Sequence, residues 1–117
     1  MADITVTAAY GSVVEEDGFL FIGFAEGEDE EEGYVLFRQP LAGGPVWFEV
    51  SDEAFGAEGA IALVQAGPDG FEVAIAPASR ATFGFAASVA VRIGPDCEDA
   101  DQALAALRAM LGPLWQD

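Results

Sequence analysis

The sequence predicts a single α+β domain, residues 1–117, in which an antiparallel sheet of about seven strands packs on one C-terminal helix. Seven short runs are either apolar throughout or alternate between apolar and polar residues, as strands of a packed sheet do. Near the C-terminus, leucines recur at steps of three and four and define one helix. Strands and helices do not alternate along the chain, which favours an antiparallel sheet with its helix segregated.

The run at residues 19–24 (FLFIGF) is the most apolar of the expected strands. Large apolar side chains stand at both odd and even positions in it, which predicts a strand covered on both faces. The other runs alternate, and the strand that begins at Tyr34 ends at Pro40, because proline lacks the N–H that a ladder needs. The seven expected strands are residues 4–10, 19–24, 34–39, 46–50, 61–65, 71–76 and 88–93.

The segments between the expected strands contain residues that are typical of turns. Gly11-Ser12 is expected to open a connection after the first strand, and the segment 67–70 (GPDG) predicts a tight hairpin turn. Pro77 to Phe83 predicts one helical turn that stops at a glycine. The stretch from Ser51 to Gly59 is expected to be irregular, with Phe55 as its only apolar anchor.

The C-terminal helix is expected from about Asp99 to Leu111. Asp99 and Gln102 have the spacing of a capping box, in which each side chain bonds the backbone of the other residue. The apolar stripe is Leu104, Leu107, Leu111 and Leu114, and Gly112-Pro113 interrupts it, so the last residues should form a docked tail.

The chain carries a net charge of −17, with no lysine, no histidine and four arginines. Fourteen of its twenty-one acids lie in residues 1–58. Such a field repels nucleic acid and anionic membranes and attracts cationic partners, although it also serves solubility alone. With no signal peptide, no membrane-spanning stretch and a single cysteine, Cys97, the sequence predicts a cytoplasmic protein.

Catalysis is not expected. Without histidine or lysine, no serine has a base to activate it, and the acids lie mostly in solvated loops. Glu49 and Glu72 lie inside strands, where an outward orientation accounts for both. The acidic run 26–32 lacks the spacing of a calcium loop, so we expect no metal and no cofactor. A hydrolase or metal site built from carboxylates alone remains the least favoured alternative.

Several stretches resemble the immunity protein 10 family of bacterial polymorphic toxin systems. They are Glu15 to Gln39 (EEDGFLFIGFAEGEDEEEGYVLFRQ), WFEV at 47–50, EGAI at 58–61, FEVAIAPASRATFGF at 71–85, SVAVRI at 88–93, and the closing helix. The resemblance covers most of the chain. It implies a cytosolic antidote that binds and neutralises a cognate toxin domain, without catalysis or cofactor.

The expected partner is therefore a basic toxin domain, such as a nuclease, and neither nucleic acid nor membrane. The sequence gives no indication of a homo-oligomer. The alternative is an acidic, non-catalytic interaction or accessory domain with no toxin partner, in which the acids only keep the protein soluble. The expected partner-binding residues are the acidic loop, two aromatic anchors and a second acidic turn: Glu26, Glu28, Asp29, Glu30, Glu31, Glu32, Tyr34, Trp47, Glu15, Glu16 and Asp17.

Overall fold

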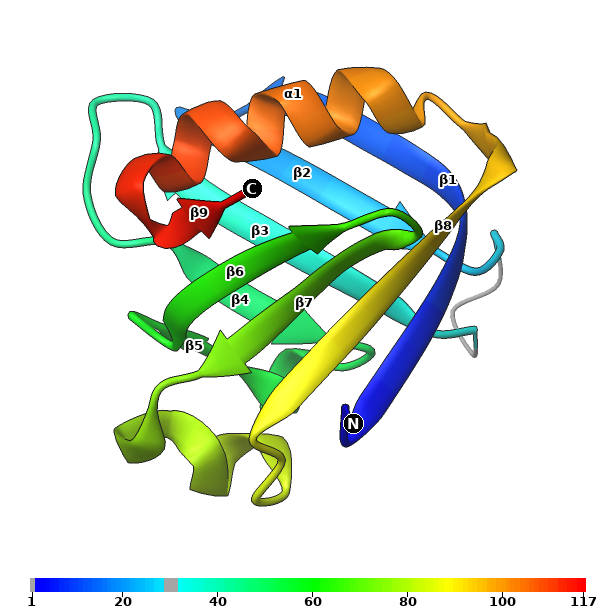
Figure 1. Cartoon of the computed structure of the whole chain (residues 1–117). Helices are drawn as coiled ribbons and strands as arrows, with labels where there is room; N and C mark the ends of the chain where they lie inside the picture. Colours follow the sequence, from blue (N-terminus) through cyan, green and yellow to red (C-terminus); the bar gives the residue numbers. More distant parts are fainter. Residues whose placement is uncertain (1, 29–31) are drawn as a thin grey trace.

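A computed structural model describes residues 2–28 and 32–117, and it places them in one mixed sheet with a single α-helix (Figure 1). The nine strands stand in the order β5-β4-β3-β2-β1-β8-β7-β6-β9. Their bounds are β1 Ile4–Glu16, β2 Phe19–Ala25, β3 Tyr34–Pro40, β4 Trp47–Val50, β5 Gly56–Glu58, β6 Ile61–Gly67, β7 Gly70–Ile75, β8 Ser88–Glu98 and β9 Trp115–Gln116. The helix α1 spans Ala100–Leu111, and short 3-10 turns occupy Glu53–Phe55 (η1), Pro77–Phe83 (η2) and Gly112–Leu114 (η3).

The α+β class is confirmed, but the expectation of seven antiparallel strands is wrong in two respects. The sheet has nine strands, and it is mixed, because β1 pairs with β8 and β6 pairs with β9 in parallel. The two additional strands, β5 and β9, have three and two residues, too few for an alternating pattern to reveal them. The parallel pairs join segments far apart in the chain, which local sequence patterns do not report.

Strand β1 connects two halves of the sheet. Its first part pairs with β8, its second part pairs with β2, and a register shift lies between Ala8 and Tyr10. Gly11 and Ser12 therefore lie within a 13-residue strand and do not open a connection as predicted. The shift also changes the side-chain alternation, so that Gly11 is buried whereas Tyr10 and Ser12 are not.

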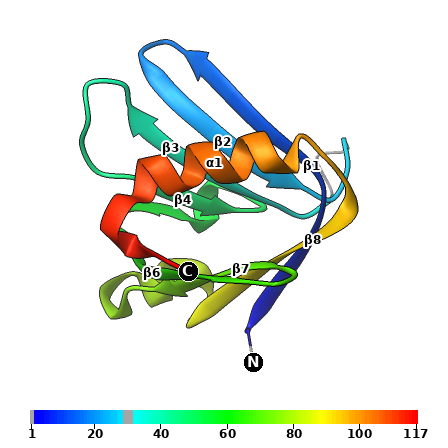
Figure 2. The ribbon, with the colours of Figure 1, turned by 45° about the horizontal axis from the view of Figure 1, so that its top comes forward.

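The two halves curl toward each other, and the core lies between them (Figure 2). Phenylalanine rings from both halves meet there: the centroids of Phe24 and Phe71 lie 5.2 Å apart, and those of Phe37 and Phe71 lie 6.2 Å apart. Phe48 extends the same layer to Phe83 in η2, at 5.7 Å. One face of β2–β4 is therefore fully buried by the other half of the sheet.

Helix α1 packs across β1 and β2 on this inner face (Figure 1). Ala103, Leu107 and Leu111 form its buried stripe. A Cβ atom added to Gly11 would lie 2.8 Å from the Cβ of Ala103, so the helix can approach β1 this closely only because Gly11 has no side chain. The helix bounds match the prediction, but the capping box does not, because Asp99 is left-handed (φ 57°) and its side chain makes no capping bond.

Of the remaining local predictions, three are confirmed and one is wrong. The 67–70 hairpin, the helical turn at Pro77–Phe83 and the docked tail are confirmed, the tail by a 5.8 Å contact between the rings of Phe71 and Trp115. Phe55 is not an anchor, since it is 46% exposed. Its segment forms η1 and the edge strand β5, which pairs with β4.

Candidate functional site

Strand β2 is covered on one face only, which corrects the expectation that both of its faces are buried. Ile22 and Phe24 point into the core and are fully buried. Phe19 and Phe21 point the opposite way and stay partly exposed, because the helix and strands β6–β8 all lie on the inner face. An apolar strand thus presents two phenylalanines on an outer surface.

Strand pairing extends this outer surface over five strands, β1 to β5. One row across the sheet runs from Val14 through Phe21, Arg38 and Trp47 to Glu58. Directly paired residues on neighbouring antiparallel strands share a face, so these five side chains all point outward. The first four of them, together with neighbours on β2 and β3, form what we name the outer patch: Val14, Phe19, Phe21, Tyr34, Leu36, Arg38 and Trp47.

Glu49 lies beneath the outer patch and holds its two hydrogen-bonding aromatics. The Tyr34 hydroxyl donates to one carboxylate oxygen of Glu49, and the Trp47 indole N–H donates to the other at 3.0 Å. Glu49 points outward as expected, yet it is only 6% exposed and is the one buried charged residue within the described part of the chain. The two predicted anchors, Tyr34 and Trp47, are thus fixed by the same buried carboxylate.

The residues around Glu49 leave room for its two aromatic partners and keep Tyr34 protonated. Gly56 pairs with Glu49 on the neighbouring edge strand, and a Cβ atom there would overlap the Trp47 ring at 2.3 Å. The indole therefore lies against bare backbone. The second partner of Glu49 is Tyr34. Burial raises the pKa of Tyr34 well above its usual value near 10, and the hydrogen bond to Glu49 raises it further. Tyr34 remains a neutral donor at physiological pH.

Arg38 occupies the centre of the outer patch. Its guanidinium carbon lies 4.8 Å from the centroid of the Trp47 ring and 5.4 Å from that of Phe19. These distances are within the range of cation–π contacts, which hold the guanidinium between two rings. Tryptophan, tyrosine and arginine are also the residues most enriched at the energetic centres of protein interfaces. The arrangement suits the binding of another protein.

Glu26, the first residue of the predicted acidic loop, is engaged within the fold. Its carboxylate accepts hydrogen bonds from the backbone N–H of Thr7 at 3.0 Å and of Gly33 at 3.1 Å. These bonds tie the loop to β1, beside the register shift. Glu26 therefore acts as a structural residue in the free protein, unlike the exposed Glu28 and Glu32.

The other predicted acids that the structure describes lie at the two ends of β2 and not on one side of the patch. Glu28 and Glu32 are exposed at the loop end, whereas Asp29, Glu30 and Glu31 lie outside the described residues. Glu15, Glu16 and Asp17 are exposed at the opposite end, next to Phe19. Acids thus flank the outer patch at both ends without forming a continuous cluster. Of the two predicted anchors, Tyr34 begins β3 next to the acidic loop, whereas Trp47 pairs with Arg38 and lies farther from it.

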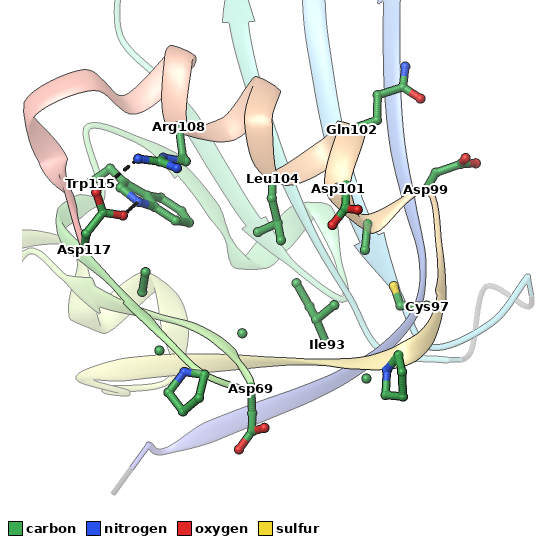
Figure 3. Close-up of a pocket in the computed structure, with 17 residues that line it drawn as sticks. Asp69, Ile93, Cys97, Asp99, Asp101, Gln102, Leu104, Arg108, Trp115 and Asp117 are labelled. Carbon is green, nitrogen blue, oxygen red and sulfur yellow. Dashed lines mark hydrogen bonds and ion pairs between the residues drawn. The ribbon is translucent and has the colours of Figure 1, made fainter.

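A groove of about 980 Å³ lies on another part of the molecule, between α1, the β6–β7 turn and the end of β8. Figure 3 shows Ile93, Leu104 and Trp115 pointing into it, while Asp69 and Asp99 point away. The Asp117 carboxylate accepts two hydrogen bonds, one from the Arg108 guanidinium at 3.0 Å and one from the Trp115 indole at 2.9 Å. The groove therefore offers apolar contact area, and its one arginine is already paired.

Cys97 lines the same groove but is a poor nucleophile there. Burial raises the pKa of its thiol, and the charges of Asp99 and Glu98 raise it further, so the reactive thiolate is disfavoured. Within residues 2–28 and 32–117, no three histidine, cysteine or acidic side chains gather closely enough to hold a metal ion. We therefore place the candidate site on the outer patch, where the side chains suit protein recognition.

The sequence analysis did not predict five members of this site: Val14, Phe19, Phe21, Leu36 and Arg38. The two phenylalanines were assigned to the core because the whole run 19–24 is apolar. A signal was nonetheless present in the next strands. There the residues that share a face with them are Leu36 and Arg38 in β3 and Trp47 and Glu49 in β4. A face that mixes aromatics with charges is typical of a surface in contact with both water and a partner.

Among the helices in the described part of the chain, none is long and apolar enough to cross a membrane. Comparison of the chain with protein families, with curated proteins and with solved structures found no match.

Proposed function

We propose that this protein is a cytoplasmic immunity protein that binds and neutralises a cognate toxin domain with a basic surface, such as a nuclease. It works as a binding partner and not as an enzyme. The observation that carries the proposal is the outer patch: aromatic side chains on a sheet face that the fold itself leaves uncovered. Exposed apolar surface of this kind is kept where a partner covers it.

Charge favours a basic protein as that partner. The chain carries a net charge of −17, and exposed acids flank both ends of the patch. Complementary charge accelerates association and disfavours wrong partners. A second copy of this chain would bring two strongly acidic surfaces together, so self-association through the patch is disfavoured. The resemblance to immunity protein 10 sequences agrees with a toxin as the partner.

The proposal is tested by capturing the partner with matched baits. The tagged wild-type chain, Phe21→Ser on the patch and Leu63→Ser on β6 are each incubated with native cytosol. Leu63 is a suitable control because it is an exposed leucine in a strand outside the patch. We expect a basic protein that is retained by the wild type and by Leu63→Ser but lost with Phe21→Ser.

The captured protein is then expressed in a heterologous host, alone and together with each variant. The immunity function predicts toxicity that the wild-type chain suppresses and Phe21→Ser does not. A face-dependent partner that is not toxic would instead support the accessory-domain alternative. If no protein distinguishes Phe21→Ser from Leu63→Ser, the outer patch is not the binding face and the proposal fails.

A further inference from the structure

The strongest unexplained feature of the outer patch is the cation at its centre. The protein has twenty-one acids and only four arginines, so an arginine on its surface has many potential carboxylate neighbours. Yet the only ion pair among the described residues joins Arg108 and Asp117, and Arg38 makes no side-chain hydrogen bond within them. The guanidinium offers five N–H donors, and the fold supplies aromatic rings beside them.

The strand register places aromatic residues directly beside Arg38, and the acid diagonally across from it is already engaged. That acid is Glu49, which pairs with Leu36 and whose two carboxylate oxygens accept hydrogen bonds from Tyr34 and Trp47. In its own row the neighbours are Phe21 on one side and Trp47 on the other, and Glu58 follows only beyond Trp47. Arg38 also stands four residues beyond Tyr34, where the acidic loop joins β3, which corresponds to about 13 Å along a strand. The two residues that pair directly with Arg38 are thus aromatic, and the nearby carboxylate of Glu49 is satisfied by other donors.

The rings also restrict the guanidinium. A free arginine side chain loses rotamer freedom when it binds, but one held between two rings has lost part of that freedom before binding. Its planar fork is then ready for a bidentate contact with a carboxylate, the acceptor whose geometry it matches best. Burying this charge in an interface without such an acceptor is strongly unfavourable.

We propose that Arg38 is the specificity-determining residue of the outer patch and that it receives a carboxylate side chain from the partner. This inference rests on the proposed protein-binding function and deepens it. The partner then has a basic surface with an Asp or Glu at the centre of the contact. Basic proteins that lack this acid leave Arg38 buried and unpaired, so the patch rejects them although the overall charge attracts them.

The test uses a displayed library of random short peptides, because it does not depend on knowing the partner. Wild-type chain, Arg38→Gln and Phe21→Ser are immobilised separately, and the peptides enriched on each are sequenced. We expect the wild type to select peptides in which an Asp or Glu is surrounded by Lys or Arg. Arg38→Gln should select basic peptides without the preference for an acid.

The best wild-type peptide is then synthesised with its acid and with the matching amide, Asn or Gln. The wild-type chain should bind the acidic form about tenfold more tightly or better, and Arg38→Gln should bind the two forms equally. Arg38→Lys should recover only part of the preference, because an ammonium cannot make the bidentate contact. The melting of each variant is compared with the wild type, which separates binding effects from unfolding.

The possible failures are distinguishable. If wild type and Arg38→Gln enrich the same peptides, or the amide form binds as well as the acid, the inference about Arg38 is wrong while the patch remains a binding face. If wild type and Phe21→Ser enrich peptides equally, the patch binds nothing, and both the inference and the proposed function are wrong.

Discussion

At the scale of single residues, Glu49 shows how a buried charge is accommodated in this fold. Both of its oxygens accept hydrogen bonds from aromatic donors, one from the Tyr34 hydroxyl and one from the Trp47 indole. A buried carboxylate is tolerated only when its acceptors are satisfied in this way. The same two bonds fix the orientation of both aromatic rings at the surface. Glu49 thus links the stability of the sheet to the shape of the outer patch.

This link predicts a loss of stability at alkaline pH. The pKa of Tyr34 is raised in the folded protein, whereas the unfolded chain titrates near 10. The contribution of this hydroxyl to the free energy of unfolding is therefore complete below pH 10 and is lost as pH rises toward the folded pKa. Denaturant unfolding measured on both sides of pH 10 should show the decline in the wild type.

Variants assign this decline to one hydroxyl. Tyr34→Phe removes the titrating group and should flatten the dependence above pH 10, although it lowers stability at neutral pH by about 1 kcal/mol. Tyr10→Phe is the control, because Tyr10 lies on the same face but makes no hydrogen bond to a carboxylate within the described residues. An alkaline decline that Tyr34→Phe leaves unchanged would contradict the assignment.

At the scale of elements, the fold depends on the close approach of α1 to β1. Contact between Gly11 and Ala103 sets the distance between helix and sheet. Gly11→Ala should force the helix outward and lower the free energy of unfolding by about 1–3 kcal/mol in denaturant melts. Gly94→Ala is the matched control, since a Cβ atom at Gly94 meets nothing within 4 Å. Equal stability of the two variants would show that the helix position does not depend on Gly11.

The elements also show how far the sequence could predict this structure. The seven longer strands and the helix were predictable, because their side-chain periodicity is local. The parallel pairing of β1 with β8 was not, since it depends on how distant segments meet. The exposed face of β2 could not be predicted either. Residues 19–24 are apolar at both odd and even positions, so the sequence does not show which face of the strand is covered. Tyr34 and Trp47 were found as candidate anchors, but their shared contact with Glu49 required the strand register.

At the scale of the whole molecule, the uneven charge should govern how fast a partner is captured. Replacing Glu28, Glu30, Glu31 and Glu32 by glutamine should slow association with the cognate basic protein by roughly an order of magnitude and weaken its salt dependence. The dissociation rate should change little, because steering charges at a rim act mainly before contact. Stopped-flow mixing at several salt concentrations measures both rates.

A control with the same change in charge is available elsewhere on the surface. Glu72, Asp96, Glu98 and Asp101 are exposed and lie outside both the patch and the acidic loop. Their amide variants alter the net charge equally, so they should slow association less if the loop steers the partner. Identical rates for the two fourfold variants would mean that only the total charge matters.

If a basic protein covers the outer face of β1–β4, hydroxyl-radical footprinting should show that face protected in the complex. Side-chain oxidation is compared between the free chain and its complex with the captured partner. We expect protection of Phe19, Phe21 and Trp47 on binding. Oxidation of Leu63 should not change, nor should that of Trp115, which lines the groove on another part of the molecule. Protection of Trp115 with no change at Phe21 and Trp47 would show that the partner binds at the groove and not on the outer patch.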